Sequence, residues 1–323
     1  GAVARPARTA TTPDALQVAD SPCTVLLSAT GRALRVDRDP DAPEGTRAAP
    51  RATKHGAVAS RVASTVRGEL GAILSDGTLH RFTPVDLPLV PAASIAFSAG
   101  VKLADYIGLT DKKLRIVGIV PLDSDVPVGL FTSQGVVKRV VLTDLPARPE
   151  FEVISLKPGD KLIAAFSAPD GTEFAAVSSD AQLLRFSADL VRPQGRPAGG
   201  MAGMKLAADA AVIFAAAVAE DAEARVATVA EGSDENALLS ALVSSAKVSD
   251  WADFPAKGRA TGGVRAQRFL RGEDRLAAAW VGSGEPRALA PDGAARKLPE
   301  ELGKRDGSGT PLESAIAHIG EAP

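Results

Sequence analysis

Short apolar runs interrupted by tight polar turns recur along the chain and predict β-hairpins. Four segments align with one another: "LLSATGRALRV" (26–36), "AILSDGTLHRF" (72–82), "GLFTSQGVVKRV" (129–140) and "AAVSSDAQLLRF" (175–186). Each begins with apolar residues, passes through Ser or Thr into a two-residue turn such as Asp-Gly or Gln-Gly, and continues as an alternating run. Two such runs around a short glycine or aspartate turn are typical of a β-hairpin.

One arginine keeps its place in this repeat. It stands five residues after the turn position in all four segments, and its copies are Arg35, Arg81, Arg139 and Arg185. A further hairpin, "RALAPDGAARKLP", has Lys297 five residues after Asp292. The remaining unit should lie around Val243, where the hairpin is degenerate and Val248 replaces the arginine.

Most units have a second half with a signature of its own. It consists of an apolar stretch, a polar turn and a fully apolar run, as in "IGLTDKKLRIVGIV" (107–120) and "ISLKPGDKLIAAF" (154–166). Two hairpins per unit would give four strands, and about six units fill the chain. Four-stranded repeats of this length are typical of propeller blades. The final "ESAIAHIG" fits a closing strand that pairs with the first unit.

Two alanine-rich segments, 207–230 and 237–247, allow a different interpretation. Alanine is the best helix former, so local propensity alone predicts helices there. The same position in other units is rich in Val and Ile, which favour strands. We therefore expect strands, and we expect Trp251 and Trp280 to lie in the blade core.

A glycine-rich motif occurs twice, as "QGRPAGGMAGMKL" (194–206) and "KGRATGGVRAQRF" (257–269). The second copy begins 63 residues after the first, so both fall at equivalent points of adjacent units. Glycine lets a backbone approach its surroundings closely and can expose amide donors to a phosphate. The motif therefore indicates a shared site that carries an arginine in each copy.

Composition narrows the class of protein. The chain has 323 residues, 45% hydrophobic, with a formal net charge of −2, so a uniformly basic nucleic-acid binder is disfavoured. A single cysteine, Cys23, excludes an internal disulfide framework. His55, His80 and His318 have no second ligand at helical spacing, and motifs for nucleotide, metal or serine-hydrolase chemistry are absent. We expect no catalytic residue, metal or cofactor, and a cytoplasmic protein without a membrane span.

Charge is distributed unevenly despite the small total. Residues 46–68 and 255–272 each carry five basic residues without a carboxylate, and 191–208 carries three. Acidic residues are concentrated in 220–236, which contains six carboxylates and one arginine. Separate basic and acidic segments suit a molecule with a phosphate-binding edge beside other faces.

The hairpins "SDGTLHRFTPVDLP" and "SQGVVKRVVLTDLP", together with the "GRxxGG" segments, resemble the C-terminal domain of bacterial type IIA topoisomerase A subunits. The resemblance covers nearly the whole chain. It implies an all-β, six-bladed β-pinwheel, with four antiparallel strands per blade, strands exchanged between neighbours, and a basic rim that bends or wraps duplex DNA. The whole chain, 1–323, would then be one such domain. Its six blades would span 15–65, 66–122, 123–168, 169–220, 221–282 and 283–323.

The resemblance also implies partners. These are double-stranded DNA, the ATPase subunit of an ATP-dependent isomerase, and the breakage-reunion domain that precedes this one in the same polypeptide, near the nucleoid. The family cleaves DNA with a tyrosine in that upstream domain, whereas Tyr106 here has a context that predicts strand packing. We expect the isolated domain to be monomeric, and the chain resembles an excised accessory domain.

One departure from the family bears on the subtype. The A subunit of DNA gyrase carries a "QRRGGRG" box in its first blade, and the corresponding "GTRAAPRATKHGAV" (45–58) lacks it. This favours a topoisomerase IV-like subunit that bends DNA, while a divergent gyrase that wraps DNA stays open. A propeller that serves as a protein-interaction platform is the alternative of another class. A propeller enzyme is disfavoured because inward His or Asp positions do not repeat.

Candidate DNA-binding residues follow from the basic segments and the repeats. They are Arg47, Arg51, Lys54, Lys138, Arg139, Arg192, Arg196, Lys205, Lys257, Arg259, Arg265 and Arg268. The repeat arginines are equally compatible with bracing an adjoining blade. Aromatic residues make up only 4% of the chain, so stacking on single strands is disfavoured and the duplex backbone is the expected ligand.

Overall fold

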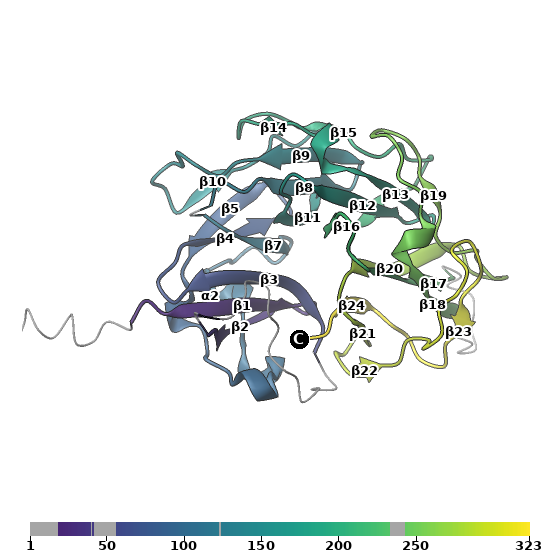
Figure 1. Cartoon of the computed structure of the whole chain (residues 1–323), viewed down its shortest axis with the longest axis horizontal. Coiled ribbons are helices and arrows are strands. Elements are labelled where there is room, and N and C mark those ends of the chain that lie inside the picture. The colour runs from purple at the N-terminus through teal and green to yellow at the C-terminus, as the bar shows by residue number, and fades with distance from the viewer. Residues whose placement is uncertain (1–18, 40, 42–55, 123, 233–242) are drawn as a thin grey trace, which may run out of the picture.

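The computed structural model describes residues 19–39, 41, 56–122, 124–232 and 243–323. In Figure 1 its sheets follow one another around a ring, in chain order from purple to yellow. The described part contains four separate sheets and one seven-stranded sheet that joins the first and last units. The chain is therefore an all-β ring of six blades.

The repeated hairpins form as predicted in units 1 to 4 and in unit 6. In unit 5 the hairpin was expected around Val243, but its second strand begins at Ser244 and pairs with a strand that ends at Glu231, before the undescribed residues 233–242. The paired strands are the middle strands of blades 1 to 5, whereas the second hairpin strand of blade 6 is the edge of its sheet. The pairs are β1 (Pro22–Ser28) with β2 (Arg32–Asp37), β4 (Leu70–Leu74) with β5 (Thr78–Phe82), β8 (Val128–Thr132) with β9 (Val136–Val140), β12 (Thr172–Ser178) with β13 (Gln182–Ser187), β17 (Arg225–Glu231) with β18 (Ser244–Asp250), and β21 (Pro286–Leu289) with β22 (Ala295–Arg296). We number the blades 1 to 6 in this order.

A third strand of each unit lies toward the centre of the ring and pairs with the first hairpin strand. These inner strands are β3 (Val58–Thr65), β7 (Ile116–Pro121), β11 (Leu162–Ser167), β16 (Val212–Ala219), β20 (Arg275–Gly282) and β24 (His318–Glu321). Neighbouring inner strands contact one another. The last strand, β24, also pairs with β3 through Glu321 and Val58, so the end of the chain closes the ring as expected. The strand begins only at His318, and its partner is the inner strand β3, whereas pairing with the N-terminal strand was expected.

The outer strand of each completed blade comes from the following unit. Figure 1 shows β10, β14, β15, β19 and β23 at the periphery. The exchanged pairs are β6 (Val101–Lys102) on β2, β10 (Glu150–Glu152) on β5, β14 (Pro193–Gln194) and β15 (Met201–Ala202) on β9, β19 (Val264–Arg265) on β13, and β23 (Thr310–Pro311) on β18. The expectation of a second hairpin in each unit was therefore wrong, because the second half divides its strands between two blades.

We call the stretch between the second hairpin strand of a unit and its inner strand the crossing segment. The crossing segments of units 2 to 6 are 83–115, 141–161, 188–211, 251–274 and 297–317. Each leaves its own blade, lies along the edge of the preceding blade and returns to the centre. The corresponding stretch of unit 1 contains 42–55, which lies outside the described residues.

Side chains between adjacent blades form the core. One cluster joins Val177 and Leu183 of blade 4 to Val226 and Leu276 of blade 5, with Trp251 packed among them. Trp280 is also buried, so both tryptophans lie in the core as predicted. The alanine-rich stretch 207–230 forms β16 and most of β17, so strands occur there as predicted. In the second stretch, 237–247, residues 237–242 lie outside the described residues and 244–247 begin β18.

Each repeated arginine bonds to the crossing segment of the next unit and holds it against its own blade. We call this set of contacts the clamp. Arg35 donates to the Leu87 carbonyl (3.3 Å), and Arg81 donates to the Pro146 carbonyl (2.6 Å). In each case the acceptor belongs to the crossing segment of the next unit. An irregular segment has carbonyl groups without strand partners, and a partly buried guanidinium supplies the donors they need.

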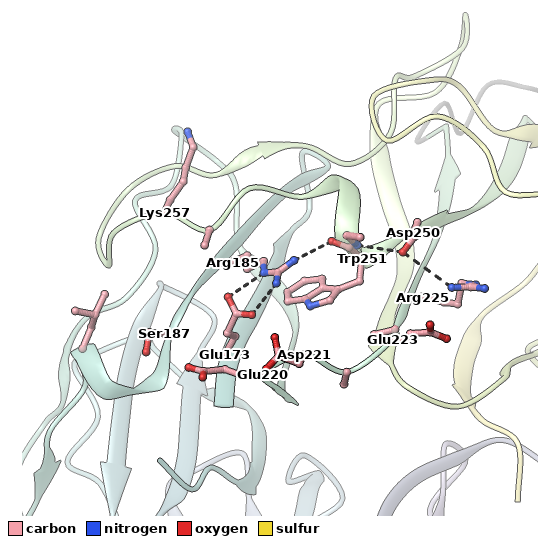
Figure 2. Close-up of a pocket in the computed structure, with 15 residues that line it drawn as sticks. Glu173, Arg185, Ser187, Glu220, Asp221, Glu223, Arg225, Asp250, Trp251 and Lys257 are labelled. Carbon is pink, nitrogen blue, oxygen red and sulfur yellow. Dashed lines mark hydrogen bonds and ion pairs between the residues drawn. The ribbon is translucent and has the colours of Figure 1, made fainter. Parts of the chain in front are cut away.

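The clamp continues in blades 3 and 4. Arg139 donates to the Ala168 and Val191 carbonyls, both at 3.1 Å, and pairs with Asp170. Arg185 donates to the Trp251 carbonyl (3.0 Å), stacks over that indole at 4.4 Å and pairs with Glu173, as Figure 2 shows. These contacts favour the bracing interpretation of the repeat arginines.

Tyr106 differs from the expectation of strand packing. It ends a one-turn helix, α2 (Leu103–Tyr106), within the crossing segment of unit 2. Its hydroxyl donates to the Thr83 carbonyl at 2.6 Å, and its ring packs edge-on against Phe82. The side chain thus joins two parts of its own unit.

Replacing Arg139 with Met tests the clamp. Two buried carbonyls would lose their donors, and an unsatisfied buried acceptor costs roughly 1–3 kcal/mol. We expect urea unfolding to show a loss of about 3 kcal/mol. Arg225→Ala is the matched control, because Arg225 makes only a half-exposed pair with Asp250 at 4.0 Å, and its loss should cost less than about 1 kcal/mol. Equal losses in the two variants would contradict the clamp.

Cys23 tests the integrity of blade 1. The residue is fully buried, and burial raises the pKa of its thiol to about 11. Because the thiolate is the reactive form, we expect no reaction with a thiol reagent at about pH 8 in the folded state. The same reagent should modify one thiol per chain after unfolding in urea. Rapid labelling of the folded protein would show that blade 1 opens readily.

Candidate nucleic-acid interface

Successive crossing segments meet edge to edge at the periphery of the ring. Ala260 N–H donates to the Gly203 carbonyl (2.8 Å), and Lys205 N–H donates to the Thr261 carbonyl (3.0 Å). Further along, Arg268 N–H donates to the Gly307 carbonyl (2.9 Å). We call the linked residues 192–206, 257–268 and 304–310 the rim band. The two glycine-rich motifs lie within it.

The motif arginines connect each crossing segment to the one before it. Arg196 donates to the Glu152 carbonyl (3.2 Å) and lies over the Phe151 ring at 5.2 Å. Arg259 donates to the Ala202 carbonyl (2.7 Å) in the same way. Both side chains remain partly exposed, so donors that these bonds leave unused are available to a ligand.

A third copy of the motif escaped the sequence analysis. Arg305 donates to the Arg265 carbonyl (2.7 Å), which is the equivalent bond one blade further on. The surrounding "GKRDGSGT" (303–310) has Asp and Ser where the other copies have small residues. Arg305 follows Arg259 by 46 residues, a spacing that also separates the hairpins, and this was the signal that could have revealed it.

The second glycine of each Gly-Gly pair explains why the motif recurs. Gly200 and Gly263 have φ of +85° and +77°, a left-handed conformation that side chains disfavour. A Cβ on Gly200 would also lie 2.7 Å from the Val137 carbonyl oxygen. The glycines therefore allow the crossing segment to turn sharply against the blade that receives it.

Exposed cations cover the rim band. It carries nine Lys and Arg residues and one carboxylate, Asp306. Six of the basic residues are exposed: Arg192, Lys205, Lys257, Arg265, Arg268 and Lys304. Within the described part of the chain, the side chains of Lys205 and Arg268 have no ion-pair or hydrogen-bond partner. Free cations at this density attract a polyanion.

Two candidate residues lie elsewhere. Lys138 and Arg139 are buried, with exposures of 0% and 2%, and bond to backbone carbonyls. The sequence showed that they belong to a basic hairpin but not that the crossing segment covers them. Direct contact with DNA does not fit their burial. Arg47, Arg51 and Lys54 lie outside the described residues.

The rim changes character toward blades 1 and 2. Within the crossing segment of unit 2, residues 87–101 carry no charge, and Leu89 is 51% exposed. In unit 3, residues 141–156 carry three carboxylates against Arg148. The basic arc therefore extends over the outer edges of blades 3 and 4 and reaches blade 5.

An acidic hollow of about 830 Å³ adjoins this arc between blades 4 and 5. Five carboxylates line it against three basic residues, Arg185, Arg225 and Lys257. Figure 2 shows Glu220, Asp221 and Glu223 there, with Asp250 paired to Arg225. Carboxylates in an open hollow repel phosphates. The hollow therefore marks where a phosphate-binding surface would end.

The described residues were also compared with the requirements of a metal site and of a membrane span. No group of three or more His, Cys, Asp or Glu side chains there is placed to hold a metal ion. No described helix is long and apolar enough to cross a membrane. Half-burial and the nearby Arg115 lower the pKa of His318, which pairs in β24 at the ring closure.

Comparison with known proteins agrees with this arrangement. The family model for the DNA gyrase C-terminal domain, a β-propeller, matches residues 130–148, 173–219 and 247–279. Topoisomerase subunit TopoM of Mycolicibacterium smegmatis is 33% identical over 140 residues, which cover 43% of this chain and 17% of that protein. The DNA gyrase A subunit of Mycobacterium tuberculosis is 25% identical over 214 residues, covering 64% and 23%. The chain thus spans a quarter or less of the length of these relatives.

Solved structures share the fold. The C-terminal domain of DNA topoisomerase IV superposes with a TM-score of 0.70 at 17% identity, covering 94% of both chains. The DNA gyrase A C-terminal domain gives a TM-score of 0.63 at 16% identity, covering 94% of this chain and all of that one. Ring closure and strand exchange together define the molecule as a β-pinwheel.

The sequence matches point to one family within that class. The chain is similar to the C-terminal domains of bacterial type IIA topoisomerase A subunits, such as those of DNA gyrase and topoisomerase IV. The resemblance seen in the sequence is thereby confirmed. The matched segments contain the clamps of blades 3 and 4 and both glycine-rich motifs.

The role of the motif glycines is open to a paired test. Gly263→Ala places a side chain at positive φ against the Leu183 backbone, so we expect a loss of about 1–3 kcal/mol in the free energy of unfolding. A Cβ on Gly258, five residues earlier, would meet nothing within 4 Å, and Gly258→Ala should change stability by less than about 0.5 kcal/mol. Thermal and urea unfolding of both variants measure the difference. A neutral Gly263→Ala would show that the turn tolerates a side chain.

Proposed function

We propose that this domain binds duplex DNA along the rim band and bends it, as an accessory part of a type II topoisomerase. The observation that carries the proposal is the continuous arc of exposed cations on linked crossing segments. Lysine and arginine neutralise phosphates and release counterions, which gives affinity without dependence on sequence. The domain would thereby present DNA for strand passage.

The length of the basic arc favours bending over wrapping. DNA that follows a whole perimeter needs cations all along it, whereas residues 87–101 are uncharged and 141–156 are acidic. A partial path bends the duplex, and bending 20–30 base pairs costs on the order of 1–6 kcal/mol. Several phosphate contacts along blades 3 to 5 would offset that cost.

We infer a topoisomerase IV-like subunit, supported by this partial arc and by the absence of a "QRRGGRG" box from 45–58. The corresponding partners are a separate ATPase subunit, together with the breakage-reunion domain of the same polypeptide, at the nucleoid. The second candidate is a gyrase subunit that wraps DNA. It is favoured by the match to the gyrase family model and by the gyrase relatives.

A salt series of duplex binding tests the DNA surface. The logarithm of the affinity should fall linearly with the logarithm of the salt concentration, with a slope of about −0.9 for each phosphate contact. Lys205→Ala combined with Arg268→Ala should weaken binding and make the slope shallower by about 2. Fluorescence anisotropy with a labelled duplex gives both quantities.

Lys112→Ala is the matched control, because this exposed lysine lies in the turn before β7, outside the rim band. Its affinity and slope should equal those of the unchanged chain. Absence of binding even at low ionic strength would overturn the proposed function and favour a protein-interaction platform. Binding that the double substitution leaves unchanged would place the DNA elsewhere on the domain.

A DNA topology assay distinguishes a topoisomerase IV-like subunit from a gyrase subunit. In it the domain is joined to its breakage-reunion domain and assembled with the ATPase partner. We expect relaxation and decatenation without negative supercoiling. Introduction of negative supercoils would identify a domain that wraps DNA and would contradict the topoisomerase IV-like assignment.

A further inference from the structure

Two buried lysines lie directly beneath the rim band. Lys138 of β9 and Lys247 of β18 occupy equivalent places, since each immediately precedes the position of the repeat arginine. Their exposures are 0% and 3%. Neither can reach a phosphate on the surface, so neither acts by touching DNA.

Each ammonium group holds one rim turn by its backbone. Lys138 Nζ donates to the carbonyls of Val153, Arg196 and Ala198, all at 2.8 Å. All three of its hydrogens are therefore used, and two of the acceptors belong to the turn that carries Arg196. A single side chain thus orders the first copy of the glycine-rich motif.

Lys247 does the same one unit before the end of the ring. Its Nζ donates to the carbonyls of Lys304 (2.7 Å), Arg305 and Gly307 (2.9 Å). These residues form the third copy of the motif. In blade 4 the equivalent residue is Leu184, and the turn above it is closed instead by Thr261, whose hydroxyl donates to the Gly258 carbonyl (2.9 Å).

The two lysines are buried cations without a bonded counter-ion. In the described part of the chain, no carboxylate lies within ion-pairing distance of either ammonium group. Burial lowers the pKa of both side chains to about 8, with Arg196 adding to the effect at Lys138 and Arg305 at Lys247, where Asp306 opposes it. Their charge therefore adds to the positive potential of the rim from below.

We propose that Lys138 and Lys247 are positioning residues for DNA, which hold the rim turns in their binding conformation and supply buried positive charge beneath them. This inference rests on the proposed DNA-binding function. Bound phosphates above a turn stabilise the charged form of the lysine. DNA and a proton therefore bind cooperatively, and affinity should fall as the pH rises through about 8.

Folding stability depends on pH in the opposite direction. The folded-state pKa of about 8 lies below the ordinary value of 10.5, so between these values the unfolded chain binds more protons. The contribution of these two lysines to stability therefore rises with pH across that window. A loss of DNA affinity there would not reflect unfolding caused by these groups.

The experiment measures affinity for a duplex of about 30 base pairs at several salt concentrations, from about pH 7 to 9. We expect Lys138→Met and Lys247→Met each to weaken binding by about fivefold. The salt slope should become shallower by less than the change of about 1 that the loss of a direct phosphate contact produces, because neither lysine touches DNA. Leu184→Met is the matched control and should leave both unchanged. Lys138→Arg combined with Lys247→Arg keeps the charge at all these pH values and should make the affinity less dependent on pH.

The outcomes separate this inference from the proposed function. If the unchanged chain shows no salt-sensitive binding, the proposed function fails and the inference with it. If the unchanged chain binds but the methionine variants match Leu184→Met in affinity, slope and pH profile, the inference alone is wrong. Should a methionine variant fail to fold, the unchanged chain and the arginine variant still decide, because identical pH profiles for these two would overturn the proposal.

Discussion

The ring depends on the transfer of strands from each of units 2 to 6 to the sheet of the preceding unit. A blade that kept its own strands would end in an open edge of unpaired N–H and C=O groups. Here the crossing segment of the next unit covers that edge, as β19 covers β13. The units are therefore incomplete alone, and the ring follows from satisfying the backbone of one unit with that of the next.

The exchange leaves backbone carbonyl groups that buried and partly buried cations satisfy. The crossing segments are irregular, so their carbonyl groups lack the regular partners of a sheet. Arg81, Arg139 and Arg185 reach across to those carbonyls, and Lys247 takes over in blade 5, where Val248 replaces the arginine. Arginine and lysine thus have two roles in this ring. Those beneath the crossing segments bond to backbone carbonyls, and those exposed at the rim are available to a ligand.

The exchange also brings the basic residues together. Crossing segments are displaced outward and meet edge to edge, which places Lys205 beside the turn of Arg259 although 54 residues separate them. Acidic residues gather instead in the hollow between blades 4 and 5. Basic residues dominate the rim and carboxylates outnumber basic residues in the hollow, and this is why a net charge of −2 is compatible with a basic rim.

Local patterns in the sequence determined the hairpins, the closing strand and the burial of both tryptophans, because each depends on periodicity or on a turn of two residues. Tertiary structure decided where the second half of each unit goes, since a strand such as β10 shows no preference for its own blade over the preceding one. It also decided that Lys138 and Arg139 are interior while Lys205 and Arg268 are free. A cation on a strand looks the same in the sequence whether or not another segment crosses above it, and only the folded ring establishes which strands are covered.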